Sequence, residues 1–391
     1  MNEILKSFFD DFHIGVYFLQ KNARTECHIK DLKNCGIDLV FGIDNDTALL
    51  ELLHKNGIYA VVSGVLPGWF GGQGNNAGSM SETNQIDEYI KGIEAFVDHP
   101  AIIGVDIGDE PSALDFPYYS EVIELIKQLL PDKFPYLNLY PSYGMLASNT
   151  IEQIEKELRT VDYQEYIESY CRYIELPYLS FDHYVYSSDK ERFFDDLFTV
   201  ATFCNENKKR LYVILQVNSQ KQEDFISEQQ LCFQAFSALA YGAFAISWAC
   251  YSAGWWYNNV LDIYGNKTEQ YEKLKNVNHK LRCLTTEYIK YQWVDTVKIN
   301  FGNTAQFDIF ELICSSQDIL LGKFEKKDGA KAIFVFSMEP NSTGNILSFY
   351  VKQNKSVYLW SLDGCCRLIS DTDGVYRVDL SEYEAAFITV D

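Results

Sequence analysis

The sequence lacks the segments that place a protein in a membrane or carry it across one. No apolar stretch in its 391 residues approaches the roughly 20 that a membrane-spanning helix needs. The first residues, MNEILKSFFDDFHIGVYF, contain neither a basic region nor the unbroken apolar core of a signal peptide. These absences predict a cytoplasmic protein with no membrane partner, or a secreted one if a leader has been removed.

Positive charge is also scarce. The chain has 33 Lys and Arg against 55 Asp and Glu, a formal net charge of -22, and no basic run concentrates charge of the other sign. Such a chain repels phosphate backbones and anionic lipids. The sequence therefore argues against nucleic acid as a partner.

The ten cysteines form no recognisable motif. They are scattered without CxxC spacing, and the one close pair is Cys365 and Cys366. This pattern indicates neither a disulfide framework nor a zinc site. We expect reduced thiols, and the sequence asks for no cofactor and no metal.

Apolar and aromatic residues are abundant. Apolar residues make up 47% of the chain, which is enough to offset the entropy of folding and rules out disorder. Aromatic residues make up 15%, including 27 Tyr and 26 Phe, more than core packing usually demands. Flat amphipathic side chains of this kind suggest contacts with sugar rings.

Up to about residue 290, short apolar runs alternate with amphipathic stretches, the pattern of βα units in a parallel sheet. The candidate strands are 13–19, 37–43, 58–65, 102–107, 135–140, 178–184, 211–217 and 244–250. The candidate helices are 46–55, 84–97, 117–130, 149–159, 162–174, 189–206, 227–241 and 267–287. Eight strands predict a (β/α)8 barrel over residues 1–292.

Past about Trp293 the pattern changes to short alternating strands separated by turn signals such as DG and PNSTG. We expect a β-sandwich domain over residues 293–391. It shows no dense aromatic cluster, so we expect a structural lid or a dimer contact, which leaves room for a homo-oligomer.

Active sites of such barrels lie where the strands end at their carboxyl side. The fourth candidate strand ends in GVDIGDEP, which places Asp109 and Glu110 side by side. Two adjacent carboxylates repel each other, so one should have a raised pKa and hold a proton near neutrality, as a general acid must. The alternative is that both are ordinary acids at the start of the next helix.

Other strand ends supply further candidates. Strand six ends in Asp182, His183 and Tyr184, which offer a nucleophile or base, an orienting group and a sugar contact. The alternative for His183 is a loop cap. Gln216 ends strand seven and can bond sugar hydroxyls, but it cannot be a nucleophile. The remaining candidates for substrate binding are aromatic, with core packing as the alternative for Trp248: Trp69 in the glycine-rich loop 68–78, Tyr140, Trp248, Tyr251, Trp255 and Trp256.

The run HPAIIGVDIGDEP resembles the fourth-strand segment of clan A glycoside hydrolases, in which a Glu before Pro is the acid/base residue. Glu110 matches that residue, and Asp109 takes the place usually held by Asn. The run LDIYGNKTEQYEKLKNVNHKL is similar to the segment after strand eight of barrel β-galactosidase-like proteins, and Trp248 falls where the clan has a strand-eight Trp. The likeness covers the layout of residues 10–290 and implies a glycoside hydrolase acting on oligosaccharides.

The likeness has one departure. The clan has its nucleophilic Glu at the end of strand seven, where this chain has Gln216. Three interpretations follow. A two-carboxylate hydrolase would pair Glu110 with Asp182, or with Glu223 as second choice. A substrate-assisted N-acetylhexosaminidase would use Asp109 to orient the sugar's acetamido group and Glu110 as the acid. A sugar-binding pseudoenzyme would have kept the groove and lost the chemistry.

Overall fold

The computed structural model describes residues 3–44, 46–64, 77–83, 90, 98–252, 254, 256–339, 344–352, 355–361, 364–380 and 384–391. By their contacts, these residues divide into two compact units. One comprises Met1–Ile226 and Ala245–Lys275, and the other Ser227–Phe244 and Asn276–Asp391. No helix in the described ranges is long and apolar enough to cross a membrane.

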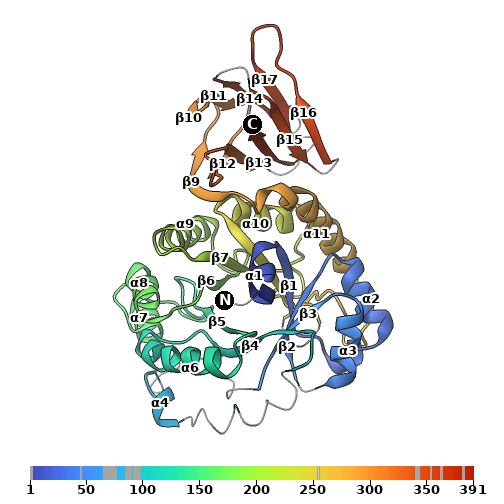
Figure 1. Cartoon of the computed structure of the whole chain (residues 1–391), viewed down its shortest axis with the longest axis vertical. Helices are drawn as coiled ribbons and strands as arrows, with labels where there is room; N and C mark the ends of the chain where they lie inside the picture. Colours follow the sequence, from blue (N-terminus) through green and yellow to red (C-terminus); the bar gives the residue numbers. More distant parts are fainter. Residues whose placement is uncertain are drawn as a thin grey trace. The chain divides into compact units, whose positions relative to one another are not determined.

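Eight parallel strands close into a barrel in the order of the chain, with helices around it (Figure 1). The strands are β1 (His13–Tyr17), β2 (Leu39–Ile43), β3 (Tyr59–Val62), β4 (Ile102–Asp109), β5 (Phe134–Leu139), β6 (Tyr178–His183), β7 (Arg210–Gln216) and β8 (Ala243–Ala249). The ring closes where β1 pairs with β8, with Gly15 opposite Ser247. The (β/α)8 barrel expected from the sequence is therefore confirmed.

The helices are α2 (Glu26–Asn34), α3 (Thr47–Lys55), α4 (Met80–Thr83), α6 (Phe116–Leu129), α7 (Ile151–Leu158), α8 (Tyr163–Tyr173), α9 (Lys190–Glu206), α10 (Glu228–Ala240) and α11 (Glu269–Tyr288). Their starts follow local chemistry. Thr150 and Ser227 each form a capping box with a Gln three residues later, which satisfies backbone N–H groups at the helix start. The helix expected over residues 84–97 lies outside the described residues.

One further helix, α1 (Glu3–Asp10), closes the amino-terminal end of the barrel. Phe8 stacks on His13, and Phe9 packs against Phe134 and Tyr178, residues at the beginnings of β1, β5 and β6. The helix therefore covers the end of the barrel at which these strands begin.

Aromatic side chains fill much of the barrel itself. Tyr136, Tyr178 and Phe41 are almost completely buried, and the Tyr136 ring lies 4.6 Å from that of Phe41. Much of the aromatic content that suggested sugar contacts therefore packs the core instead.

The carboxy-terminal strands form a β-sandwich of two antiparallel sheets, as expected. The sheets have the orders β10-β11-β14-β17 and β16-β15-β18-β13-β12-β9. Phe310 and Phe349 from the first sheet share one core with Leu321 and Ile388 from the second. The boundary at residues 292 and 293 stays a prediction, because the contacts group α10 with the sandwich: the Phe236 ring packs on Phe334 and Phe336. The strands are β9 (Gln292–Ile299), β10 (Ala305–Phe307), β11 (Phe310–Ser315), β12 (Ile319–Glu325), β13 (Lys331–Ser337), β14 (Ile346–Val351), β15 (Val357–Ser361), β16 (Gly364–Leu368), β17 (Tyr376–Asp379) and β18 (Ala385–Val390).

Candidate active site

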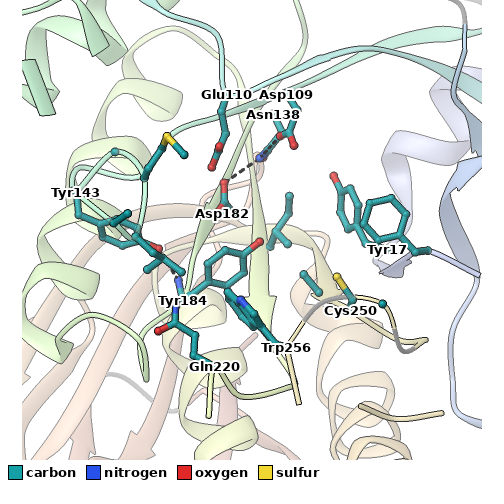
Figure 2. A pocket seen from close by; sticks show the side chains of 18 of the residues that line it. Tyr17, Asp109, Glu110, Asn138, Tyr143, Asp182, Tyr184, Gln220, Cys250 and Trp256 are labelled. Carbon is teal, nitrogen blue, oxygen red and sulfur yellow. Dashed lines mark hydrogen bonds between the residues drawn. The ribbon is translucent and has the colours of Figure 1, made fainter. Parts of the chain in front are cut away.

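A cavity of about 680 Å³ opens at the carboxyl ends of the barrel strands (Figure 2). Three carboxyl groups line it, those of Asp109, Glu110 and Asp182. The structure thus brings together all three acids that the sequence singled out as catalytic candidates. Other lining residues include Tyr17, Phe18, Gln20, Asn138, Tyr143, Gly144, Met145, Leu146, Ala147, Tyr184, Ile214, Gln220, Ala249, Cys250, Ser252, Gly254 and Trp256.

The backbone at Glu110 explains how two consecutive acids reach one cavity. Successive side chains of a strand normally point to opposite faces. Glu110 follows the last residue of β4 and has a φ of 47°, in the left-handed region that non-glycine residues rarely adopt. Its backbone N–H still donates to the carbonyl oxygen of Asn138 at 2.9 Å, which ties it to β5. The break in alternation lets both Asp109 and Glu110 line the cavity, and strained residues of this kind cluster at functional sites.

Asn138 joins the acids of β4 and β6. Its Nδ2 atom donates to Asp109 Oδ1 at 3.0 Å and to Asp182 Oδ1 at 2.9 Å. On the other side of the amide, Ser180 Oγ donates to Asn138 Oδ1 at 3.1 Å. Both hydrogens of the amide group are thereby used on carboxylates, as Figure 2 shows for the two bonds.

Glu110 points toward Asp182 across the cavity (Figure 2). Burial raises the pKa of Glu110 well above its usual value, and the charges of Asp182 and Asp109 raise it further. Neighbouring buried carboxyl groups repel each other when all are ionised, so one of them should hold a proton. The raised pKa places that proton on Glu110.

The neighbouring acids also hold protons more tightly than usual. Burial raises the pKa of Asp182 to about 7 and that of Asp109 to about 6, while the bonds from Asn138 act in the opposite direction. Asp106 lies three residues before Asp109 in β4. Burial and the charge of Asp109 raise the pKa of Asp106 to about 7. Among the described lining residues there is no Lys, Arg or His to offset these charges.

Aromatic rings form other parts of the wall. Tyr184 and Trp256 meet edge to face with their ring centres 4.9 Å apart. Phe18 is 48% exposed and has a φ of 62°. Its ring lies over Gly42, where an added Cβ would come within 2.8 Å of the Phe18 ring, so the glycine makes room for it. Such flat apolar faces suit the faces of sugar rings.

A braced loop completes the wall beside Glu110. Residues 144–147 line the cavity, and Glu157 of α7 holds them by accepting from Met145 N at 2.8 Å and from Ser148 Oγ at 2.5 Å. A Cβ at Gly144 would collide with the Glu157 carboxylate, so this close approach requires a glycine.

Five of the predicted substrate-binding residues do not line the cavity: the four below and Gln216. Tyr140, His183, Trp248 and Tyr251 have no exposed surface. The complete burial of Trp248 agrees with the alternative that this residue packs in the core. Trp69 and Trp255 lie outside the described residues. Tyr184 and Trp256 do line the cavity.

His183 shows how strand alternation decides these placements. Asp182 and Tyr184 line the cavity, whereas His183 between them packs against Phe193 of α9. Its Nδ1 pairs with Asp196 Oδ2 at 2.8 Å and its Nε2 with Ser188 Oγ at 2.9 Å. These residue types also make up serine-hydrolase triads, but a fully enclosed imidazole cannot reach a leaving group. His183 therefore anchors the loop between β6 and α9.

Gln216 and Glu223 lie away from the acids. Gln216 is 1% exposed, and its Nε2 donates to Ser187 Oγ at 2.9 Å and to the carbonyl oxygen of Asn218 at 3.0 Å. Its Oε1 accepts from Tyr186 N at 3.0 Å, so the side chain ties together the loops after β6 and β7. Glu223 is exposed and does not line the cavity.

Sequence reasoning missed Asn138, Tyr17, Phe18 and Tyr143. Asn138 had a detectable signal, since it is the one polar side chain within the run PYLNLY near the end of strand five. The other three look like ordinary core aromatics in the sequence. In the described part of the chain, no cluster of His, Cys, Asp and Glu could hold a metal ion.

No protein-family profile matches this chain, and a search of curated proteins gave no significant match. Among solved structures, the chain is similar to a Bacteroides thetaiotaomicron VPI-5482 protein provisionally assigned as an alpha-L-fucosidase. The TM-score is 0.51 and the identity 11%, over 69% of this chain and 96% of that one. It is also similar to the GH2 beta-galacturonidase of Eisenbergiella tayi, with TM-score 0.46 and 14% identity, over 68% of this chain and 51% of that one.

A third similar structure is the exo-beta-1,4-mannosidase Op5Man5 from Opitutaceae bacterium strain TAV5. It has TM-score 0.46 and 12% identity, over 71% of this chain and 60% of that one. The neighbours named here are thus assigned as glycoside hydrolases. The first of these structures, with a TM-score of 0.51 at 11% identity, supports the fold of the barrel alone. The chemistry of this chain has to be argued from its own residues.

Proposed function

We propose that this protein is a glycoside hydrolase in which Glu110 is the general acid/base. The observation that carries the proposal is that the carboxyl groups of Glu110 and Asp182 face each other in a cavity at the carboxyl ends of the barrel strands (Figure 2). A glycosidase needs a protonated carboxyl group next to the leaving oxygen at neutral pH. Glu110 meets that requirement, because its pKa is raised well above its usual value by burial and by neighbouring acids.

Asp182 is the proposed partner, and its separation from Glu110 bears on the mechanism. Retaining enzymes hold their two carboxyl groups about 5–5.5 Å apart and inverting ones about 6.5–9.5 Å apart. With Glu110 as the acid, Asp182 would attack carbon in a retaining enzyme or activate water in an inverting one.

A second candidate is the substrate-assisted hydrolase, in which the sugar's own acetamido oxygen is the nucleophile. The observation that favours it is that Asp109 and Glu110 are consecutive residues and both line the cavity. Asp109 would orient the acetamido group while Glu110 donates the proton. This candidate needs no second carboxylate at the distance of a nucleophile.

The walls favour an uncharged sugar. The described lining residues include no cationic side chain. A carboxylate or sulfate on the sugar would lose its hydration and meet three acids instead of a counter-ion. We therefore propose neutral glycosides as substrates.

The test replaces Glu110 by Gln, which keeps the shape of the side chain and removes the proton. Turnover of disaccharides should fall by about 10²–10⁴-fold. Turnover of the matching 4-nitrophenyl glycoside should fall much less in the bond-cleaving step, because nitrophenolate leaves without protonation. Glu121→Gln, on the exposed face of α6, is the matched control. Equal losses on both substrates would contradict the acid role.

A labelling experiment separates the two candidates. A 2-deoxy-2-fluoro aryl glycoside that forms a lasting glycosyl ester at Asp182, found by peptide mass, supports the two-carboxylate hydrolase. Inhibition by a bicyclic thiazoline of N-acetylglucosamine, with loss of activity in Asp109→Asn and its retention in Asp182→Asn, supports the substrate-assisted one. Saturable sugar binding with no product formed over days would support the third interpretation, a sugar-binding pseudoenzyme.

A further inference from the structure

A one-way chain of hydrogen bonds runs through the barrel to Asn138. Tyr17 OH lies 2.5 Å from Tyr136 OH, which lies 2.9 Å from Ser180 Oγ, and Ser180 Oγ donates to Asn138 Oδ1. Each hydroxyl has a single hydrogen. Because Ser180 donates its one hydroxyl hydrogen to Asn138, Tyr136 must donate to Ser180. Tyr17 must then donate to Tyr136.

The two carboxylates determine which way the Asn138 amide faces, and the chain of hydroxyl groups matches that orientation. An amide turned by 180° would present its oxygen to two carboxylates and its N–H groups to the Ser180 hydroxyl. With Ser180 donating, the carbonyl oxygen of the amide is held on the core side and both N–H groups face Asp109 and Asp182. Successive donors in one direction also polarise one another, which strengthens the last bonds of the chain.

We propose that Asn138 is a positioning residue that assigns the protons of the cavity: it favours the carboxylate forms of Asp109 and Asp182 over that of Glu110, so that the exchangeable proton resides on Glu110. Two N–H donors favour the charged forms of the two aspartates, and neither reaches Glu110. The proton is then left to Glu110, whose carboxyl group faces Asp182 (Figure 2). This inference rests on the proposed function for its catalytic meaning, but the proton assignment itself does not.

Other titratable groups surround the trio and none supplies a positive charge. They come from β1, β4, α7, the loops after β5 and β6, and the loop after β8: Tyr17, Asp106, Glu157, Tyr143, Tyr184 and Cys250. Burial raises the pKa of each of these phenols and of the thiol, so they stay neutral near pH 7. The ionised forms of the aspartates must then be favoured by hydrogen bonds from neutral donors. Asn138 supplies one Nδ2 hydrogen to Asp109 and the other to Asp182.

The test is Asn138→Leu, which removes the donors at similar size. A hydrogen bond to a charged group is worth enough to move a carboxyl pKa by about 1–2 units. The acid limb of kcat/KM, where an essential carboxylate takes up a proton, should move up by about that amount. Asn138→Asp should move it at least as far, because it adds an acid in place of the amide.

A readout without substrate decides the proton assignment. In protein labelled with 13C at the aspartate carboxyl groups, the midpoints of Asp109 and Asp182, assigned with Asp109→Asn and Asp182→Asn, should rise in Asn138→Leu. Unchanged midpoints in the folded variant would overturn the proposal. If the wild type cleaves no glycoside, the proposed function fails while these midpoints still test Asn138.

Milder variants serve if Asn138→Leu does not fold. Ser180→Ala and Tyr136→Phe break the chain upstream and should shift the same midpoints upward by a smaller amount. Ser247→Ala and Tyr212→Phe are matched controls, because their mutual bond of 2.7 Å lies in the same core and outside the chain. If the midpoints shift as much in the controls as in Ser180→Ala, or if they shift in no variant, the proposal is overturned. Asn138 would then have a structural role only.

Discussion

The two halves of the cavity wall differ in kind. The half built from β4, β5 and β6 contains the three carboxyl groups and the amide that joins two of them. The half built from β7, β8 and β1 presents mostly apolar or aromatic groups, such as Ile214, Ala249 and Phe18. The comparison teaches that the titratable acids are confined to one side of the cavity, so the proposed function assigns the proton transfer to that side and the shaping of the substrate space to the other.

The largest expected effect comes from removing the partner acid of the first half. If Asp182 is nucleophile or base, Asp182→Asn should lower kcat for both disaccharides and 4-nitrophenyl glycosides by at least about 100-fold, because a better leaving group cannot replace that role. Steady-state kinetics on both substrates measure it. Full activity in this variant, with loss in Asp109→Asn, would move the chemistry to the substrate-assisted route.

Charge on the substrate is the next test of the acidic half. Matched 4-nitrophenyl hexosides and hexuronides differ only in CH2OH against carboxylate. For any pair that reacts, kcat/KM of the hexoside should exceed that of the uronide by about 100-fold or more, because the carboxylate finds no cation in the cavity. A uronide that reacts as fast as its hexoside would contradict the account of the walls.

The apolar half should govern binding rather than chemistry. Phe18→Ala should raise KM by about 3- to 10-fold with little change in kcat, as expected for the loss of one aromatic contact. Phe225→Ala is the control, since Phe225 is 64% exposed and does not line the cavity. A fall in kcat with unchanged KM would instead give Phe18 a part in the chemistry.

The acid cluster should also reduce stability as pH rises. Folded Asp182 has a pKa of about 7, above its usual value, so between about pH 4 and 7 the folded state binds more protons than the unfolded state. Its contribution is therefore most favourable at low pH and is lost as pH rises through the folded pKa. Asp182→Asn should raise Tm by a few degrees at pH 8 and by less at pH 5. Equal shifts at both pH values would argue against this titration.

The smallest effect on turnover is expected at Gln216. Gln216→Glu restores the residue type that clan A has at the end of strand seven, but the side chain is enclosed and bonded to Ser187 and Asn218. It should therefore give no gain in activity, and it should lower Tm because a buried acid replaces two donated bonds. A rise in kcat would show that strand seven can supply the nucleophile.

Most of the fold follows from the sequence because buried strands appear there as runs of apolar residues. The eight apolar runs correspond to the eight strands. β6 differs from its expected bounds by one residue at one end, and β7 differs by one residue at each end. The acids at the ends of β4 and β6 were found for the same reason, since a charged residue that ends an apolar run is conspicuous.

The rest of the site depends on geometry that one sequence does not encode. Which of Asp182, His183 and Tyr184 faces the cavity depends on the phase of β6 relative to the barrel, and Glu110 breaks that alternation by its positive φ. Tyr136 and Tyr17 are both tyrosines within apolar runs, yet Tyr136 is enclosed and Tyr17 lines the cavity. The sign of a φ angle and the phase of a strand are set by tertiary packing.

The central claim is that Glu110 holds a proton near neutral pH. Infrared difference spectra between wild type and Glu110→Gln at pH 7 measure this directly, because a protonated carboxyl group absorbs apart from a carboxylate. The account predicts that the wild type shows a protonated-carboxyl band that Glu110→Gln lacks, and that the band disappears as the pH is raised. A spectrum in which Glu110→Gln removes only a carboxylate band at pH 7 would contradict it.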